Sequence, residues 1–263
     1  MIVVKVISFK TSGNSMSSWY ANYLTSFFTQ GVTSSPYWYS KIYGLALYDT
    51  SGNLIKTLTN VSVGTQTSGS TQYIVISAQD TSTDSYTTDR AHVIAVTPAG
   101  AYWSIFRASA GSSVSKGSSD TLKVVYQIAF PISLGTSSGI MQGGFNAIYT
   151  DLSGGDTRGH VPITRFAIVL TSGSQQLLTG FNYTTTSGVD NNVPYYGIKY
   201  SVVDTSSDAK DVSTIELGND SEWIVCVTGY TWSKPANTTV TWWLEWRFRY
   251  GYSISSAGIP STY

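Results

Sequence analysis

The chain has 263 residues, which is enough for one large or two ordinary domains. Hydrophobic residues make up 41% of it, so it can build a substantial core, but charged residues make up only 11%. The net charge is zero, with 15 basic and 15 acidic residues. This balance excludes a protein that coats nucleic acid, because such proteins need a basic surface. It also leaves little charge repulsion between copies of the chain.

Cys226 is the only cysteine, so an internal disulfide and a cysteine-based zinc site are both excluded. It lies in the apolar pattern Trp223–Val227, where we expect an inert buried thiol. We expect no membrane span, because no apolar run approaches the roughly 18 residues that a span needs. The N-terminus is not typical of a secretion signal, since Lys5 interrupts its apolar run and no basic segment precedes it.

Alternating apolar and polar residues predict short strands through the first half of the chain. Met1–Phe9 is the first of them, and Ser18–Gln30 follows as a helix that Ser17 or Ser18 caps and Gly31 ends. Polar loops are expected at Gly64–Thr71 and Ala110–Ser119. The remaining predicted strands of this half are Ile42–Tyr48, Leu54–Thr59, Tyr73–Gln79, Ala91–Thr97 and Ala101–Ala108.

One strand pattern occurs three times, at Met1–Phe9, Leu122–Phe130 and Trp242–Tyr250. Other blocks also recur in the same order, 120 to 131 residues apart, including the loop Asp80–Asp84 at Asp204–Asp208. A second, weaker helix is expected near Met141–Leu152. These matches predict an internal duplication. The expected fold is all-β, with two tandem antiparallel β-sandwich or jelly-roll-like domains at residues 1–120 and 121–263, each with one short helix.

No catalytic constellation stands out, and we expect no enzyme activity and no cofactor. Ser137 lies in a G-x-S-x-G pattern, but that nucleophile motif needs an α/β sheet with a histidine and an acid. His92 and His160 are the only histidines, and we expect them not to converge with Ser137. A hydrolytic or metal site around His160 is the alternative, although its spacing from acidic residues matches no specific ligand pattern.

The recurring pairs Asp80/Asp84 and Asp204/Asp208 are open to two interpretations. Carboxylates bind calcium, but they also stabilise turns by accepting hydrogen bonds from nearby backbone N–H groups. We favour turn chemistry and expect no metal site. Aromatic clusters at Tyr37–Tyr39 and Trp242–Trp246 are suited to stacking on sugars or to burial in a core or interface. Possible glycosylation sites, each heading an N-x-S/T sequon, are Asn60, Asn182, Asn219 and Asn237.

The β-rich pattern, low charge, single cysteine and abundance of Ser, Thr, Tyr and Trp resemble structural proteins of viruses of hyperthermophilic archaea, and extracellular filament subunits of the same hosts. The resemblance implies a location in a virion or at the cell surface. It also implies assembly in which a terminal strand of one subunit completes a sheet of the next.

We therefore predict a non-enzymatic structural subunit that self-assembles into a virion shell, surface spike or extracellular filament. The proposed donor strand is Met1–Phe9, whose face of Val3, Ile7 and Phe9 would bury in a neighbour, with Lys5 needing solvent or an acid. In the alternative arrangement, this strand folds into its own first domain. Other virion proteins and cell-surface glycans are further candidate partners. A carbohydrate-binding adhesin or receptor-binding spike is the second function hypothesis, and a β-fold glycosidase is the third.

Overall fold

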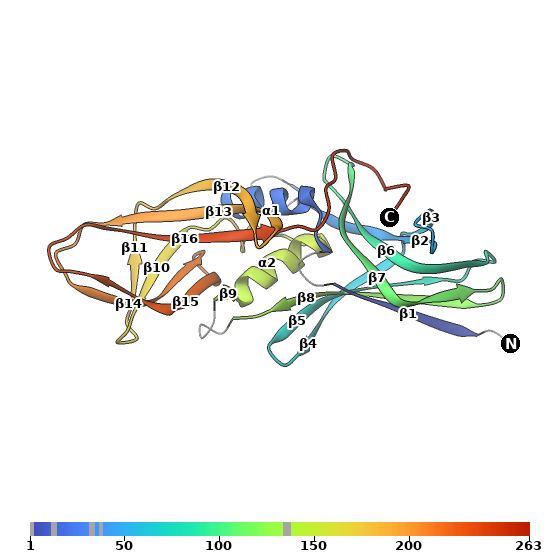
Figure 1. The fold of residues 1–263 in the computed structure, drawn as a ribbon, viewed down its shortest axis with the longest axis horizontal. Helices are drawn as coiled ribbons and strands as arrows, with labels where there is room; N and C mark the ends of the chain where they lie inside the picture. The colour runs from blue at the N-terminus through green and yellow to red at the C-terminus, as the bar shows by residue number, and fades with distance from the viewer. Residues whose placement is uncertain (1–2, 12–14, 32–34, 37–38, 134–137) are drawn as a thin grey trace.

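The computed structural model describes residues 3–11, 15–31, 35–36, 39–133 and 138–263. Most of them lie in strands, in agreement with the predicted all-β class. The molecule is elongated, with the early strands toward one end, the late strands toward the other, and the two helices near the middle (Figure 1). We refer to residues 3–133 as the first half and to residues 138–263 as the second half.

The first half contains two four-stranded sheets. Its elements are β1 (Val4–Thr11), α1 (Ser18–Gln30), β2 (Lys41–Tyr48), β3 (Leu54–Leu58), β4 (Val61–Ser68), β5 (Thr71–Asp80), β6 (Tyr86–Val96), β7 (Tyr102–Lys116) and β8 (Thr121–Pro131). One sheet has the strand order β1-β8-β5-β4 and the other β3-β2-β6-β7. The β1/β8 pair is parallel, whereas the other pairs of these two sheets are antiparallel.

The second half contains a five-stranded and a three-stranded sheet. Its elements are β9 (Gly139–Ile140), α2 (Gln142–Ser153), β10 (Arg165–Leu170), β11 (Gln175–Leu178), β12 (Asn182–Asp190), β13 (Val193–Asp204), β14 (Lys210–Gly218), β15 (Trp223–Lys234) and β16 (Val240–Arg249). The strand orders are β11-β10-β14-β15-β9 and β12-β13-β16. All pairs in these sheets are antiparallel.

Most of the strand order in the second half matches that of the first. The order β4-β5-β8 corresponds to β12-β13-β16, and β3-β2-β6-β7 corresponds to β11-β10-β14-β15. The pairing registers also match, because Asp80 lies opposite Leu122 and Asp204 lies opposite Val240. Leu122 therefore corresponds to Val240, two residues away from the match to Trp242 that sequence comparison predicts. A shift of two residues leaves each side chain on the same face of the strand, so the alternating pattern fits either alignment equally well.

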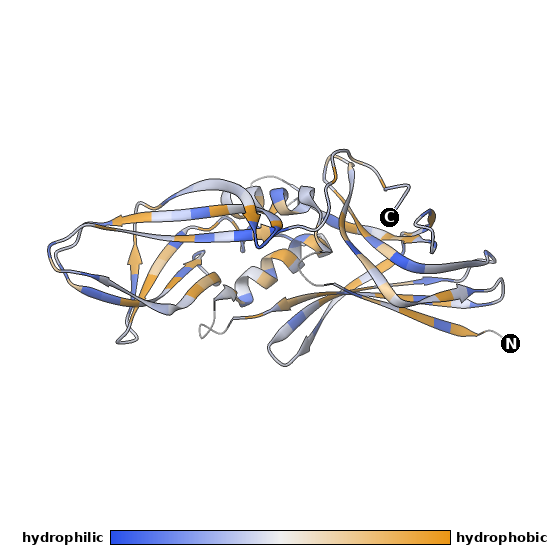
Figure 2. Cartoon of the chain, in the orientation of Figure 1, coloured by the Kyte–Doolittle hydropathy of each residue, from blue (hydrophilic) through white to orange (hydrophobic). Residues whose placement is uncertain are grey.

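Strand β8 belongs to the first half, because it pairs with both β5 and β1. A division of the chain by sheets therefore falls after Pro131 rather than at residue 120. One large cluster of buried apolar side chains includes residues from both halves, and the hydrophobic bands alternate with polar ones along the strands (Figure 2). Helix α1 packs against β13 and β16 of the second half, so the two halves share a core.

Two segments that sequence patterns predict as polar loops are strands instead. Gly64–Thr71 lies largely in β4, and Ala110–Ser119 contributes its first seven residues to β7. Both strands end the order of their sheets, where many side chains face solvent. Edge strands need no apolar alternation on an exposed face, so their pairing depends on backbone partners that local sequence does not reveal.

Helix α1 has the predicted bounds and caps. The Ser17 side chain accepts a hydrogen bond from the backbone N–H of Tyr20, with a distance of 3.2 Å, and Gly31 ends the helix with a φ of 65°. Helix α2 is less regular at its start, because Met141 provides no side-chain cap. Gly143 and Gly144 in its first turn have no side chains, which allows α2 to approach the backbone of β15 closely.

We expect Gly144→Ala to lower the free energy of unfolding by about 1–3 kcal/mol, although alanine favours helix. An added Cβ would lie 2.5 Å from the carbonyl oxygen of Ile224 and 2.7 Å from a side-chain carbon of Ile140. Urea denaturation would measure the change. Gly64→Ala is the control, because no atom lies within 4 Å of its added Cβ, and it should not destabilise the protein appreciably. A stabilised Gly144→Ala variant would contradict the close packing of α2 on β15.

Candidate functional site

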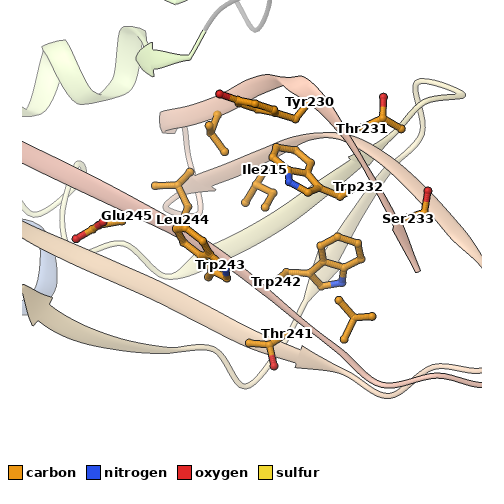
Figure 3. A pocket seen from close by; sticks show the side chains of 12 residues that line it. Ile215, Tyr230, Thr231, Trp232, Ser233, Thr241, Trp242, Trp243, Leu244 and Glu245 are labelled. Atoms are coloured by element: carbon orange, nitrogen blue, oxygen red, sulfur yellow. The ribbon is translucent and has the colours of Figure 1, made fainter. Parts of the chain in front are cut away.

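A groove with a volume of about 650 Å³ runs between β15 and β16 on one side of the second half. Trp232 lines it from β15, and Val240, Trp242 and Leu244 line it from β16. Figure 3 shows Trp232 and Trp242 on opposite sides of this space. The walls are therefore mainly apolar, as in sites that bury a ligand or a segment of another chain.

Two large aromatic side chains at this groove are exposed. Tyr230 on β15 is 65% exposed and Trp243 on β16 is 52% exposed. Lys199 lies over the Trp243 ring, with Nζ 4.5 Å from the ring centroid. Exposed aromatic rings next to an apolar groove are typical of interaction surfaces rather than of ordinary solvent-facing strands.

The groove is open because neither sheet continues on this side. Among the described residues, β16 pairs with β13 alone, and β9 covers β15 only at Val225 and Cys226. Ser138 Oγ accepts the N–H of Thr228 and donates to its C=O, so β15 has an edge that no described strand pairs only from Gly229 onward, and β16 has such an edge along its side of the groove. Unpaired N–H and C=O groups along a sheet edge favour the addition of another strand.

Trp242 is held in place by a buried carboxylate. Its Nε1 donates to Asp204 at 3.2 Å, and Lys210 Nζ donates to the same carboxylate at 2.7 Å. Burial would raise the pKa of Asp204, but hydrogen bonds from Lys210, Ser206 and Trp242 outweigh it and hold the pKa well below its usual range. The carboxylate therefore stays ionised at neutral pH, and this wall of the groove is fixed before any partner binds.

The recurring aspartates Asp80 and Asp204 both act in turns. Asp80 accepts the backbone N–H of Ser82 at 2.9 Å, and Asp204 accepts that of Ser206 at 3.0 Å. These bonds to the residue two positions on are the Asx-turn pattern, which agrees with the favoured interpretation. Within the described ranges, no cluster of three or more His, Cys, Asp or Glu side chains is arranged to hold a metal ion.

Each of these turns also encloses a buried lysine. Lys116 Nζ donates to the Ser82 carbonyl, and Lys234 Nζ donates to the Ser206 carbonyl, both at 2.5 Å. A second carbonyl in each loop, from Asp84 or Asp208, completes the cradle. Backbone carbonyl oxygens of each loop thus face an ammonium group.

The two histidines have separate environments. His92 is buried, and its Nδ1 lies 2.7 Å from Ser104 Oγ. Burial, with a smaller effect from Arg107, lowers the pKa of His92 to about 3, so it is a weak base. Because Ser104 is itself fully buried, this Ser–His pair has no access for a substrate. Ser137 lies outside the described residues.

His160 contacts a different set of residues. Its Nδ1 pairs with Glu222, and its Nε2 lies 3.4 Å from Thr150 Oγ1. The nearby Asp156 pairs with Arg158. The buried Cys226 lies 3.2 Å from Ser133 Oγ, in the strand that the sequence predicts. The His160 contacts connect loops of the second half to α2, and the Cys226 contact connects β15 to the end of the first half.

The possible glycosylation sites differ in exposure. Asn60, Asn182 and Asn237 are exposed, but Asn219 is buried, donates to the Gly159 carbonyl and accepts the N–H groups of the turn that follows it. Asn219 is therefore a structural turn residue. Of the aromatic cluster at residues 37–39, the structure describes only Tyr39.

The predicted donor strand is an integral strand in the single chain. Ile7 and Phe9 are buried in the chain's own core, whereas Val3 is 39% exposed. Lys5 finds the acid that its position requires, since its Nζ lies 2.6 Å from Asp120. The chain thus shows the alternative arrangement, in which the first strand folds into its own first half. Sequence analysis missed the groove, because a missing sheet partner leaves no local sequence signal.

No described helix is long and apolar enough to cross a membrane. Searches of protein-family models, curated proteins and solved structures found no match to this chain.

Proposed function

We propose that the protein is a non-enzymatic structural subunit that assembles into a virion shell, surface spike or extracellular filament. The observation that carries the proposal is the apolar groove between two free sheet edges, with exposed Tyr230 and Trp243 beside it. Such a surface is stabilised by the addition of a protein strand, which satisfies backbone groups and buries apolar side chains together. The low charge of the chain adds little repulsion against close packing of copies.

We further propose that the chain consists of two β-sandwich-like units related by duplication. Support comes from the shared strand orders and from the repeated turn that encloses Lys116 in one half and Lys234 in the other. We propose a virion or surface location, in archaea of hot environments, from the amino-acid composition of the chain.

Assembly of the purified protein tests the proposed function. We expect electron micrographs and sedimentation to show ordered polymers or shells, formed by the protein alone or together with the other chains of the assembly. We expect the double variant Tyr230→Ser, Trp243→Ser to reduce this assembly at least roughly ten-fold while remaining folded, because exposed positions contribute little to folding. Val189→Ser is the matched control, since Val189 is 69% exposed on β12 and lies outside the groove. A protein that stays monomeric at every concentration, with or without added components, would count against a structural role.

A carbohydrate-binding adhesin is the second candidate, and the exposed rings of Tyr230 and Trp243 favour it. Sugar stacking on these rings would change tryptophan fluorescence on titration with oligosaccharides. Saturable binding that the double variant abolishes, in a protein that forms no polymer, would favour this candidate over assembly.

A further inference from the structure

The first half shows what occupies the side that is open in the second half. There, β1 lies parallel to β8, with Val4 opposite Thr121 and Thr11 opposite Ile128. It also packs against β7, so it closes the side of the sandwich between the two sheets. Ile7 and Phe9 of β1 point into the core.

The walls around β1 correspond to the walls of the groove along the paired parts of their strands, although β7 has four residues and β15 three at the register shift. Leu122 of β8 corresponds to Val240 of β16, as the registers with Asp80 and Asp204 show. The groove-lining part of β16, Val240–Glu245, therefore matches the part of β8 that lies opposite Lys5–Lys10 of β1.

The wall that β15 forms corresponds to the wall that β7 forms beside β1. Val114 of β7 lies opposite Thr88, and Trp232 of β15 lies opposite Val212. These pairs occupy the same place in the two ladders, since Tyr86–Lys116 and Lys210–Lys234 are the terminal pairs of each. The groove is thus the position of a missing strand of the β1 type.

Chain order explains why that strand is missing. In the first half, β1 precedes α1 along the chain. Ahead of α2 in the second half, the last long strand is β8, which is therefore the strand in the equivalent place. β8 is already used in the first half, between β1 and β5, so it does not reach the side of β16. Among the described residues, the chain therefore has two equivalent sheet edges, one on β8 and one on β16, but a single strand, β1, that can cover either.

The position of Lys5 argues against β1 of a second copy as the occupant. In its own half, Lys5 Nζ lies 2.6 Å from Asp120 and donates to the Ser115 carbonyl at 2.7 Å. Asp120 is two residues before Leu122, and the residue two before Val240 is Thr238, which is exposed and donates to the Pro235 carbonyl. A β1 strand in the groove would lose the Lys5–Asp120 ion pair, and a copy that gave up β1 would open its own first half.

We propose that the groove between β15 and β16 accepts an extended segment of a different polypeptide chain, which adds parallel to β16 as β1 adds to β8. The segment carries apolar side chains at the positions of Ile7 and Phe9 and an uncharged side chain at the position of Lys5. This inference deepens the proposed function by naming the chemistry of an assembly partner, and it depends on that function only for the partner's role.

Two synthetic peptides test the inference on the full-length protein. One has the sequence of residues 3–11, and the other is the same peptide with Lys5→Thr. Each carries a fluorescent label for anisotropy measurements. We expect the Lys5→Thr peptide to bind roughly two- to five-fold more tightly, because the partly exposed lysine loses the ion pair that Asp120 provides in the first half.

The variant Thr238→Asp supplies the acid that Asp120 provides in the first half. It should strengthen binding of the native peptide by roughly two- to five-fold and remove the preference for the Lys5→Thr peptide, which a double-mutant cycle quantifies. Thr67→Asp is the matched control, since Thr67 is also exposed and lies on β4 at the far edge of a first-half sheet, and it should change neither affinity.

Absence of binding by either peptide at about 100 μM, or equal binding that Thr238→Asp leaves unchanged, would overturn the assignment of the groove. Polymers of the purified protein in which the first strand of one copy fills the groove of the next would also overturn the choice of a different chain, while leaving the proposed structural function standing. If the protein fails to assemble but prefers the Lys5→Thr peptide as expected, the assignment of the groove stands and the proposed structural function is contradicted.

Discussion

Replacing Phe9 by alanine is expected to lower the free energy of unfolding by about 3–5 kcal/mol. Phe9 is fully buried in β1, and its ring stacks on Tyr126 of β8 with centroids 5.9 Å apart. Removing it leaves a cavity in the core of the first half. Urea denaturation followed by tryptophan fluorescence would measure the loss. Val6→Ala, on the opposite face of the same strand and 55% exposed, should change stability by no more than about 0.5 kcal/mol.

Deletion of residues 1–11 extends this test to the role of the first strand. The deletion exposes the edge of β8 and removes both Ile7 and Phe9 from the core, so we expect loss of the soluble folded protein. A deletion variant that stays folded but no longer forms polymers would contradict this expectation and support donation of the strand to a neighbour. Circular dichroism and electron microscopy of the same preparation distinguish these outcomes.

The second large effect concerns Asp151, a fully buried carboxylate on α2. It accepts hydrogen bonds from the backbone N–H groups of Tyr39 and Ser40, at 2.7 and 3.0 Å, and from the hydroxyls of Tyr23 and Ser40, both at 2.7 Å. This one side chain thus joins α2 of the second half to α1 and to the segment before β2. We expect Asp151→Ala to destabilise the protein by at least about 3 kcal/mol, because several buried donors lose their acceptor.

The charge of Asp151 makes stability depend on pH. Burial raises its pKa from 3.8 to about 6, although the hydrogen bonds from Ser40, Tyr23 and Tyr39 oppose the increase. Between these two values the folded protein binds more protons than the unfolded chain, so stability falls as pH rises. The contribution is complete below about pH 4 and lost above about pH 6, and it amounts to about 3 kcal/mol. Below pH 4 the opposite effect sets in at Asp80: burial would raise the pKa of this carboxyl, but its hydrogen bonds outweigh burial and lower the pKa to about 2.

Asp151→Asn is the variant that isolates the charge. The amide oxygen can accept the two backbone N–H groups, and the amide N–H groups can donate to the hydroxyl oxygens of Tyr23 and Ser40. We expect it to be at least as stable as the native protein at pH 7 and to lose most of the slope between pH 4 and 6. Urea denaturation at several pH values measures both. An unchanged slope would show that another group, such as Glu216 with its raised pKa, is responsible.

Local sequence determined the elements whose signals lie within a few residues. The aromatic stripe with Ser17 and Gly31 at its ends specified α1, and alternation specified strands such as β8. The repeated turns at Asp80 and Asp204 were visible because a turn uses side chains close to its own backbone. These features depend on periodicity and capping, which a single sequence contains in full.

Tertiary structure decided everything that depends on which strand lies beside which. The polar strands β4 and β7 exist because β5 and β6 supply backbone partners, and β1 is an integral strand because β8 offers an edge and Asp120 pairs with Lys5. The groove beside β16 likewise arises because no described strand pairs with that edge of β16. Backbone pairing and burial join residues far apart in sequence, so the same alternating pattern is compatible with a covered strand or an open one until the fold assigns its neighbours.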